Sequence, residues 1–548
     1  MEEASRPPTG NEGGIVLVIT LMFMLITAIG VAAFVHLTNT HITQVKLQAH
    51  STQAFYAAEV ALQKGIQFLK NDLYYTPKGT LPSWLDDKVY TSTGYIDLTQ
   101  GGQITVPRYL NPDYPHYDND FYPLVGEADY NFDGYGAYKA TYQIDISNAQ
   151  GRPDRIWVKS TGRYYRRNES GYGFTLEAER RILSLLEANE ISAWDNAIFA
   201  GEGAAGNVIS GNVDIRGSVH FLATTLGSTD LAANFSGDAG IGNNYAGIPS
   251  ALGSRIPSIV KEHGGEMVDT LEAEVRIQHG KLALSGSAQV GGPDVPGNGV
   301  KETVDGVYIT DGYSGDGAQN VYSDNGTDNP YDIDLEEFEI TFPRLSEPYE
   351  GYATYLDYLR ANALVISDAQ QLNELDDIRP TSVFEYSDSN GRIKMDGEGY
   401  LIIEGIVVVE GPVNFAKAGS EKTIEYSGAG TIVSTSTVGI NLSIITRSFS
   451  TFPKVDILGV MAGDTITFDW AQCNVMGVFY AENQIAALKQ TSVAGTFLSN
   501  YFDMGLNVPA IYKVPEIVGY LPRGMIGDTR MWAIRRLTWG EIESGISQ

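Results

Sequence analysis

The chain has 548 residues, of which 43% are apolar and 60 are glycine, so it exceeds a single ordinary domain and can bury at least one sizeable core. Its 67 acidic residues outnumber its 37 basic residues, and the resulting formal charge of −30 argues against binding to a nucleic-acid backbone. The single cysteine, Cys473, excludes an intrachain disulfide, a zinc cluster and a CxxC redox pair.

The N-terminal region contains an uncharged, apolar run from Ile15 to Val35. As a helix this run would extend ~31 Å, about the thickness of the hydrocarbon core of a bilayer. It is longer than the apolar core of a signal peptide, and no small-residue cleavage site follows it. An apolar stripe continues to about Leu73, before Pro77. The pattern predicts one helix over residues 15–73, with its first half in lipid and its second half amphipathic.

Two motifs in this helix carry a family resemblance. Residues 11–18 read N-E-G-G-I-V-L-V and residues 53–62 read Q-A-F-Y-A-A-E-V-A-L. Over about residues 11–70 the chain resembles the N-terminal region of PilX-type minor pilins of type IV pili. The resemblance implies a prepilin-type leader over residues 1–14, which a prepilin peptidase cleaves after Gly14 to leave Ile15 as the mature N-terminus.

The resemblance also implies a position in the filament. The fifth mature residue is Ile19, where major pilins have a glutamate. This replacement is similar to that of X-type minor pilins and K-type pseudopilins, which belong to a tip complex that primes assembly. Phe55 and Glu59 of the second motif are the expected contacts with neighbouring pilin helices. The leader has three glutamates and one arginine, so the expected orientation comes from the resemblance and not from the positive-inside rule.

Residues 74–193 are expected to form a pilin-like α+β region. The segment 84–131 is rich in Tyr, Asp, Pro and Gly and predicts loops with short strands. Alternating segments at 138–146, 155–163 and 173–185 predict an antiparallel sheet packed on the helix, with a turn at Thr161–Arg163.

The remaining chain predicts a large β body with loop insertions. Short strands opened by Gly206, Gly211 and Gly217 recur every five or six residues, a spacing typical of β-solenoid turns, so residues 194–300 are expected to be a first solenoid part. Residues 301–396 are predicted to be an insertion with acidic loops and a helix at 350–364, and 228–280 a smaller insertion. A β-sandwich is the alternative architecture.

A repeat of 18 residues predicts a second solenoid part over residues 397–526, followed by a C-terminal tail at 527–548. Gly459, Gly477 and Gly495 form one column of this repeat, and Lys513 in the next glycine position predicts the end of the stack. Two further columns are apolar, and they contain Ile457, Val475, Val493 and Ile511, and Met461, Phe479 and Phe497.

One segment has the beginning of a calcium loop. Asp129, Asn131 and Asp133, followed by Gly134, match D-x-[DN]-x-[DN]-G, in which oxygen ligands alternate before a tight turn. The twelfth position is Ala140, so the bidentate glutamate is missing, and a polar turn is the alternative. Ca²⁺ is the one cofactor that the sequence suggests.

Catalytic signatures are missing from the sequence. It contains no nucleophile elbow, P-loop or zinc motif. Asp464, Asp469 and Glu482 lie within the repeat, but their offsets do not place them in one column, as a carboxylate pair on one face would need. The chain is therefore expected not to be an enzyme.

The sequence thus predicts an α+β, mainly β protein, and the resemblance implies a minor pilin of a type IV pilus or related pseudopilus. Its expected partners are other minor and major pilins, the prepilin peptidase and the bacterial inner membrane. Its body would be periplasmic and, after assembly, would lie at the pilus tip or cell surface as an adhesin for a surface or glycan ligand. The alternatives are a membrane-anchored β-helix that binds or cleaves polysaccharide, and a bactofilin-like structural polymer.

Overall fold

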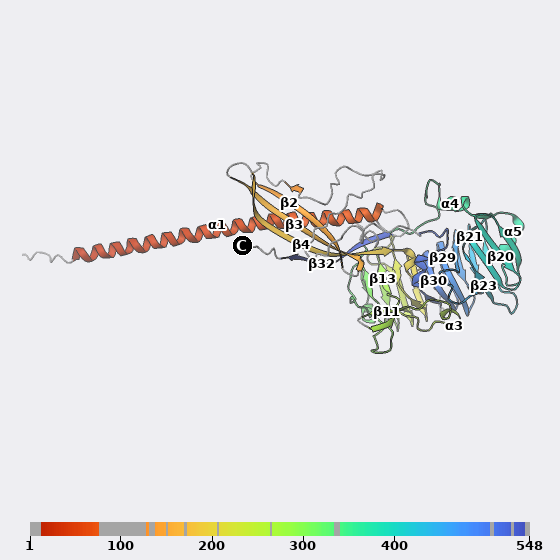
Figure 1. The fold of residues 1–548 in the computed structure, drawn as a ribbon. Helices are drawn as coiled ribbons and strands as arrows, with labels where there is room; N and C mark the ends of the chain where they lie inside the picture. Colours follow the sequence, from red (N-terminus) through yellow and green to blue (C-terminus); the bar gives the residue numbers. More distant parts are fainter. Residues whose placement is uncertain are drawn as a thin grey trace, which may run out of the picture. The chain divides into compact units, whose positions relative to one another are not determined.

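Figure 1 shows the computed structural model of the chain. It describes residues 12–75, 128–130, 138–149, 152–168, 173–204, 208–263, 266–333, 340–504, 509–527 and 531–542. The chain forms two compact units: unit 1 is Met1–Asn189 with Ile534–Gln548, and unit 2 is Glu190–Ala533. Unit 2 is therefore inserted into the sequence of unit 1.

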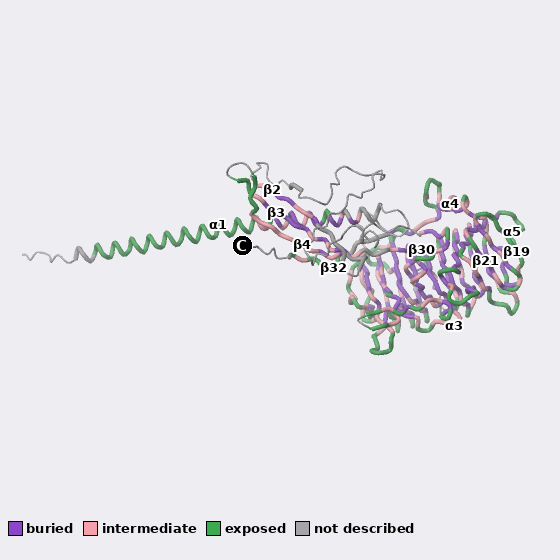
Figure 2. The backbone as a smooth tube through the Cα atoms, in the orientation of Figure 1, coloured by how far each residue is buried: buried purple, intermediate pink, exposed green. Residues whose placement is uncertain are grey.

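Unit 1 begins with α1, a single helix from Glu12 to Tyr75 that confirms the predicted continuous helix. The large apolar side chains from Val16 to Leu47 are exposed, whereas those from Ala54 to Leu69 are mostly buried (Figure 2). Hydroxyl groups in the exposed half are satisfied within the helix; Thr20, for example, donates to the Val16 carbonyl oxygen at 2.7 Å.

The sheet of unit 1 has five strands in the order β1-β2-β3-β4-β32. The pairs β1–β2, β2–β3 and β3–β4 are antiparallel, as the sequence predicted. Along β3 the side chains of Ile156, Val158 and Ser160 are buried and alternate with partly exposed neighbours, so one face of the strand packs inward. The strands are β1 (Ala128–Tyr130), β2 (Tyr138–Ala149), β3 (Arg152–Arg167), β4 (Phe174–Ile191) and β32 (Met531–Ile542).

Two expectations for unit 1 were wrong. The turn expected at Thr161–Arg163 lies within β3, where Gly162 pairs with Tyr142 on one side and Arg180 on the other. Glycine is needed at this position because the helix backbone lies very close to it, and not because the chain turns there. The expected C-terminal tail contains β32, which joins the sheet beside β4. Single-sequence patterns could not show this pairing, because the two strands are separated by the whole of unit 2.

The largest element of unit 2 is a 21-stranded sheet. Its first seven strands are β5 (Ile198–Ala204), β7 (Asp214–Arg216), β8 (Val219–Phe221), β10 (Gly240–Gly242), β13 (Glu274–Ile277), β15 (Gln289–Val290) and β16 (Gly306–Ile309). The other strands are β18 (Leu364–Ile366), β19 (Val383–Ser387), β20 (Gly391–Asp396), β21 (Tyr400–Val409), β22 (Val413–Phe415), β23 (Thr423–Ser427), β24 (Ala429–Ser434), β25 (Val438–Ile440), β26 (Ser443–Thr446), β27 (Ile457–Ala462), β28 (Thr465–Phe468), β29 (Cys473–Ala487), β30 (Thr491–Asp503) and β31 (Ala510–Tyr512).

Smaller elements complete unit 2. A four-stranded sheet contains β6 (Val208–Gly211), β9 (Leu231–Gly237), β14 (Lys281–Leu284) and β17 (Tyr313–Ser314), and a hairpin contains β11 (Val260–His263) and β12 (Glu266–Asp269). The helices are α3 (Ser250–Gly253), α4 (Tyr355–Ala361) and α5 (Ala369–Leu375), with 3₁₀ turns η2 (Ala193–Asp195), η4 (Gly317–Asn320) and η5 (Pro515–Gly519). The helix expected at 350–364 is thus present, but shorter.

Parallel pairing joins the two distant halves of unit 2 into one stack of strands. Val493 pairs with Ile511, Ile511 pairs with Ile215, and Ile215 pairs with Ile241, so the column passes from a late strand to an early one without a break. All the members of this column are β-branched and buried, and they are Ile424, Ile444, Val475, Val493, Ile511, Ile215, Ile241 and Val290. Repetition of one side-chain shape at matched positions lets each strand pack on the next.

The 18-residue repeat holds between β29 and β30 and is displaced by one residue before them. Gly477 pairs with Gly495 and Phe479 pairs with Phe497, as predicted. Gly459, however, pairs with Val478, one residue beyond the expected Gly477. The expected match of Ile457 with Val475 also fails: Val475 pairs with Ile444 of β26, because β29 lies beside β26 first and beside β27 only from Val478 on.

The stack does not end at Lys513, and this expectation was also wrong. The backbone N–H of Lys513 donates to the carbonyl oxygen of Arg216 at 2.8 Å, beside the pairing of β31 with β7. The two segments expected to be insertions also contribute to the 21-stranded sheet, through β10 and β13 in 228–280 and through β16, β18, β19 and β20 in 301–396.

Candidate functional site

The second half of α1 packs on the sheet of unit 1 through small residues. Ala54, Ala57, Ala58 and Ala61 of the A-F-Y-A-A-E-V-A-L motif are buried, and their spacing places them on one helix face. A Cβ added to Gly162 of β3 would lie 2.0 Å from the carbonyl oxygen of Ala54 and 2.4 Å from the backbone nitrogen of Ala58. Helix and strand backbones therefore approach so closely that only glycine fits at this position of β3.

The same face continues toward the end of the helix with larger side chains. Leu62 and Leu69 are buried. Between them, a Cβ added to Gly65 would lie 3.2 Å from Ile144 Cγ2 and 3.3 Å from Val158 Cγ1. The helix thus fits onto β2 and β3 through a band of small residues followed by a conventional apolar contact.

Polar side chains hold the helix along its margins. The Nε of Arg180 in β4 donates to Ser51 Oγ at 2.7 Å, and its Nη1 lies 2.9 Å from a carboxylate oxygen of Glu541 in β32. Lys64 Nζ donates to the Tyr142 hydroxyl at 3.1 Å. Arg180 therefore connects three elements of unit 1: α1, β4 and β32.

An ion-pair cluster lies on the strands beside this interface. Glu179 accepts from Nε of Arg163 and from Nε of Arg181, each at 2.8 Å. Burial of Glu179 by itself opposes its charged form, but the hydrogen bonds and positive charges of the two arginines outweigh this effect and lower its pKa. Glu179 is therefore a charged residue whose stabilisation depends on the folded sheet.

The residues predicted to pack against other helices lie on both halves of α1. Ile19 is in the exposed half, with 50% of its surface accessible. Phe55 is half-buried, and its ring meets that of Trp539 edge-on at a centroid distance of 6.4 Å. Glu59 is half-buried on the docked half. Phe55 thus contacts an aromatic ring of its own chain, whereas the side chain of Ile19 is exposed.

The predicted processing and calcium residues are only partly described. Gly14 and Ile15 lie within the first turns of α1, but the structure describes only their place in the helix. Asp129 belongs to β1, whereas Asn131 and Asp133 fall outside the described residues. Within the residues that are described, no group of three or more His, Cys, Asp or Glu side chains is arranged to hold a metal ion. The calcium loop stays a prediction.

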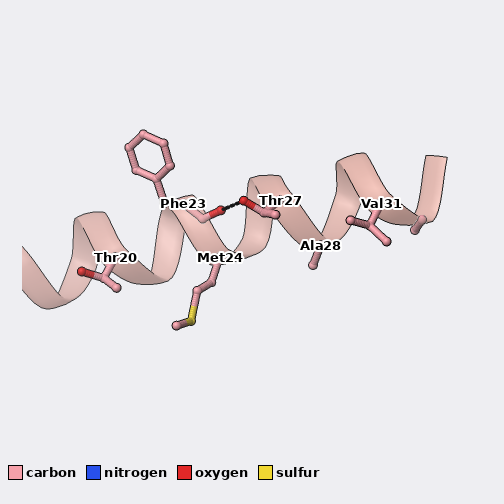
Figure 3. Close-up of a pocket in the computed structure, with 7 residues that line it drawn as sticks. Thr20, Phe23, Met24, Thr27, Ala28 and Val31 are labelled. Carbon is pink, nitrogen blue, oxygen red and sulfur yellow. Dashed lines mark hydrogen bonds between the residues drawn. The ribbon is translucent and has the colours of Figure 1, made fainter. Parts of the chain in front are cut away.

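The exposed half of α1 is long and apolar enough to cross a membrane. Figure 3 shows part of it, a shallow hollow lined by Phe23, Met24, Ala28 and other side chains of one helix. The Thr27 hydroxyl donates to the Phe23 carbonyl oxygen at 2.7 Å, so this polar group is satisfied without any partner from outside the helix. The surface is therefore suited to lipid or to other apolar helices.

Sequence reasoning missed three residues of this site. Gly162 was interpreted as a turn, although its position within an alternating β segment was a signal of close backbone approach. Arg180 and Trp539 carried no recognisable signal, because their roles depend on the pairing of strands from opposite ends of the chain.

No protein-family model matches the chain. No curated protein matches it either. Among solved structures, the chain is similar to the crystal structure of the competence-associated pilin ComZ from Thermus thermophilus, with 17% sequence identity and a TM-score of 0.47, over 90% of this chain and 97% of that one.

Proposed function

We propose that this chain is a PilX-type minor pilin that takes part in the assembly of a type IV pilus or related pseudopilus. The observation that carries the proposal is the division of α1: one continuous helix has an exposed half that contains the uncharged apolar run up to Val35, and a second half docked on its own sheet. A helix divided in this way can reside in the inner membrane before assembly and among other apolar helices afterwards. The N-E-G-G-I-V-L-V and A-F-Y-A-A-E-V-A-L motifs support the same reading.

Processing is the first step of this proposal. A prepilin peptidase cleaves between Gly14 and Ile15 and removes the leader, residues 1–14. The decisive experiment is intact and N-terminal mass spectrometry of the chain co-expressed with a prepilin peptidase, with Gly14→Ala as the comparison. A mature chain that begins at Ile15 and disappears in the variant is the expected result. A chain that keeps its first residues in both cases would leave a membrane-anchored polysaccharide-binding or polysaccharide-cleaving protein as the better hypothesis.

Assembly would use the side of α1 that faces away from its own sheet. In the docked half, Tyr56 exposes 51% of its surface while its neighbours Ala57 and Ala58 are buried. With Ile19 and the other apolar residues of the first half, Tyr56 presents surface to the helices of neighbouring pilins, and Glu59 lies at the margin of the buried face. Because Ile19 carries no charge to neutralise a neighbour's N-terminal ammonium, a place at the tip suits this subunit.

The location of the body follows from the same proposal. Before assembly, the protein is a single-pass protein of the bacterial inner membrane with its β units in the periplasm, and after assembly it lies at the pilus tip or cell surface. Unit 2 is displayed there as an adhesin for a surface or glycan ligand. The proposal assigns no catalytic residue. The Gly14→Ala chain is expected to reach the membrane in normal amounts but to leave the cells defective in pili. That result would show that assembly needs cleavage and not membrane anchoring alone.

A further inference from the structure

The geometry points to a docking site on unit 2 for a basic protein partner, at a cluster of four tyrosines before and within α4. We propose that Tyr349, Tyr352 and Tyr358, supported by Tyr355, receive an arginine side chain displayed on the surface of that partner. The inference is independent of the role of α1, because it concerns a different unit of the chain.

The cluster is built on a tight hairpin turn that stands out beside α4 (Figure 1) and is exposed at its tip (Figure 2). Tyr349 and Tyr352 form a backbone bridge, in which the Tyr352 N–H donates to the Tyr349 carbonyl oxygen at 2.8 Å. Glu350 and Gly351 between them have φ of 44° and 86°. A glutamate in this left-handed region costs more than a glycine would, so the turn holds a carboxylate at its tip at the expense of local stability.

The turn is held in place by the rest of unit 2. The Tyr355 N–H donates to the Glu347 carbonyl oxygen at 2.7 Å, and the Leu345 N–H donates to a carboxylate oxygen of Glu482 at 2.8 Å. Tyr355 is buried, and its hydroxyl donates to the Met525 carbonyl oxygen at 3.2 Å. The exposed ring of Tyr352 and the half-buried rings of Tyr349 and Tyr358 are therefore pre-organised, which reduces the entropy lost when a partner binds.

The rings surround one another at steep angles. The Tyr349 ring lies 4.6 Å from that of Tyr355 and 4.8 Å from that of Tyr358, with interplanar angles of 78° and 57°. The Tyr352 ring lies 5.6 Å from that of Tyr358 at 74°. Rings inclined in this way present faces in several directions and not one flat platform. Aromatic faces attract cations, and a planar guanidinium can stack on any one of these faces.

The charges beside the cluster favour the same partner. Glu347 and Glu350 are exposed, and within the described part of the chain neither forms an ion pair with a basic side chain. Arg344, the nearest arginine in sequence to both carboxylates, lies with its Nη1 3.8 Å from Glu482. Arg360 is paired with Glu410 through Nε at 2.7 Å and with Asp357 through Nη1 at 3.2 Å. Two exposed carboxylates without a basic partner, in the same segment as Tyr349 and Tyr352, complement a guanidinium, and tyrosine and arginine are among the residues that most often dominate protein interfaces.

The test uses the full-length chain in detergent, immobilised, with a glycine–serine peptide carrying two arginines as the probe. A peptide with citrulline at both positions keeps the shape and removes the charge. The variants are Tyr352→Ala, which removes an exposed ring, and Glu350→Gln, which keeps the turn. The matched controls are Tyr322→Ala, since Tyr322 exposes 37% of its surface against 38% for Tyr352, and Glu398→Gln, an exposed carboxylate elsewhere on unit 2.

We expect the arginine peptide to bind at least 5-fold more tightly than the citrulline peptide, and each cluster variant to weaken it about 5-fold, with less than 2-fold change in the controls. Equal weakening by the controls would mean general attraction to an acidic protein and would overturn the proposal. Equal binding of the citrulline peptide, or no binding of either, would overturn it too. So would binding of a neutral hexasaccharide that Tyr352→Ala abolishes, because the cluster would then be a glycan site.

Discussion

The two units of this protein bury their β-strands in different ways. In unit 1 burial alternates along β3, because one face of an antiparallel sheet packs on a single helix. In unit 2 all six residues of β27 are buried, and buried β-branched side chains align from strand to strand, as Val475, Val493 and Ile511 do. The comparison indicates that unit 1 depends on one interface of small residues, whereas the stability of unit 2 is spread over many similar contacts.

The largest effect should come from the aromatic centre of unit 2. Phe497 is fully buried, with the rings of Phe468 and Phe479 at 5.2 and 5.7 Å. Phe497→Ala leaves a cavity in a packed interior and is expected to destabilise unit 2 by about 3–5 kcal/mol. Hydrogen exchange read by mass spectrometry should show faster exchange in strands β27 to β30. If exchange rose equally in α1, the two units would not be independent and the comparison would fail.

A smaller but more local effect is expected at the closest contact of unit 1. Gly162→Ala places a methyl group against the backbone of Ala54 and Ala58, which cannot move aside as a flexible side chain could. We expect a loss of about 2–3 kcal/mol and release of the second half of α1 from the sheet, seen as faster hydrogen exchange. Gly540→Ala is the matched control, because nothing lies within 4 Å of an added Cβ there. Undisturbed docking in Gly162→Ala would contradict the described approach.

The next prediction concerns the contact between Phe55 and Trp539, which come from opposite ends of the chain. Trp539→Leu removes the ring that meets Phe55 edge-on and is expected to cost unit 1 about 1 kcal/mol, the range for an aromatic pair. Phe55→Leu should cost a similar amount, and the double variant should cost less than the sum of the two. Simple additivity in this double-mutant cycle would mean that the two rings do not stabilise each other.

The smallest expected effect is a dependence on acid. The folded-state pKa of Glu179 is lower than its ordinary value, so its stabilisation is present above that ordinary value and is lost as the pH falls through the folded pKa. Unit 1 should therefore lose about 1 kcal/mol or less of stability at acidic pH, and Glu179→Gln should flatten this part of the pH profile. Measurement of unit 1 exchange at several pH values checks this, with unit 2 as the internal reference. A larger loss of unit 1 stability at acidic pH in Glu179→Gln than in the natural chain would contradict this prediction.

Local patterns were sufficient for much of this fold. The helix of unit 1, the three strands that alternate in burial and the match of Gly477 with Gly495 were all predicted from spacing, because each depends on residues close in sequence. The candidate site was predicted less completely. Ile19, Phe55 and Glu59 lie on α1, and their packing against neighbouring helices stays a prediction. The alanines and Gly162, which dock this helix on its own sheet, were not recognised as an interface.

The sequence by itself determined the apolar helix, the acidic surface and the glycine and β-branched columns, since these follow from composition and periodicity. Only the tertiary structure decided that β32 completes the first sheet and that Ile511 stacks on Ile215. Both are contacts between strands hundreds of residues apart. The sequence pattern of a strand shows which of its faces are buried, but many other strands of similar pattern could pair with it, and the choice among them is made by packing of the whole unit.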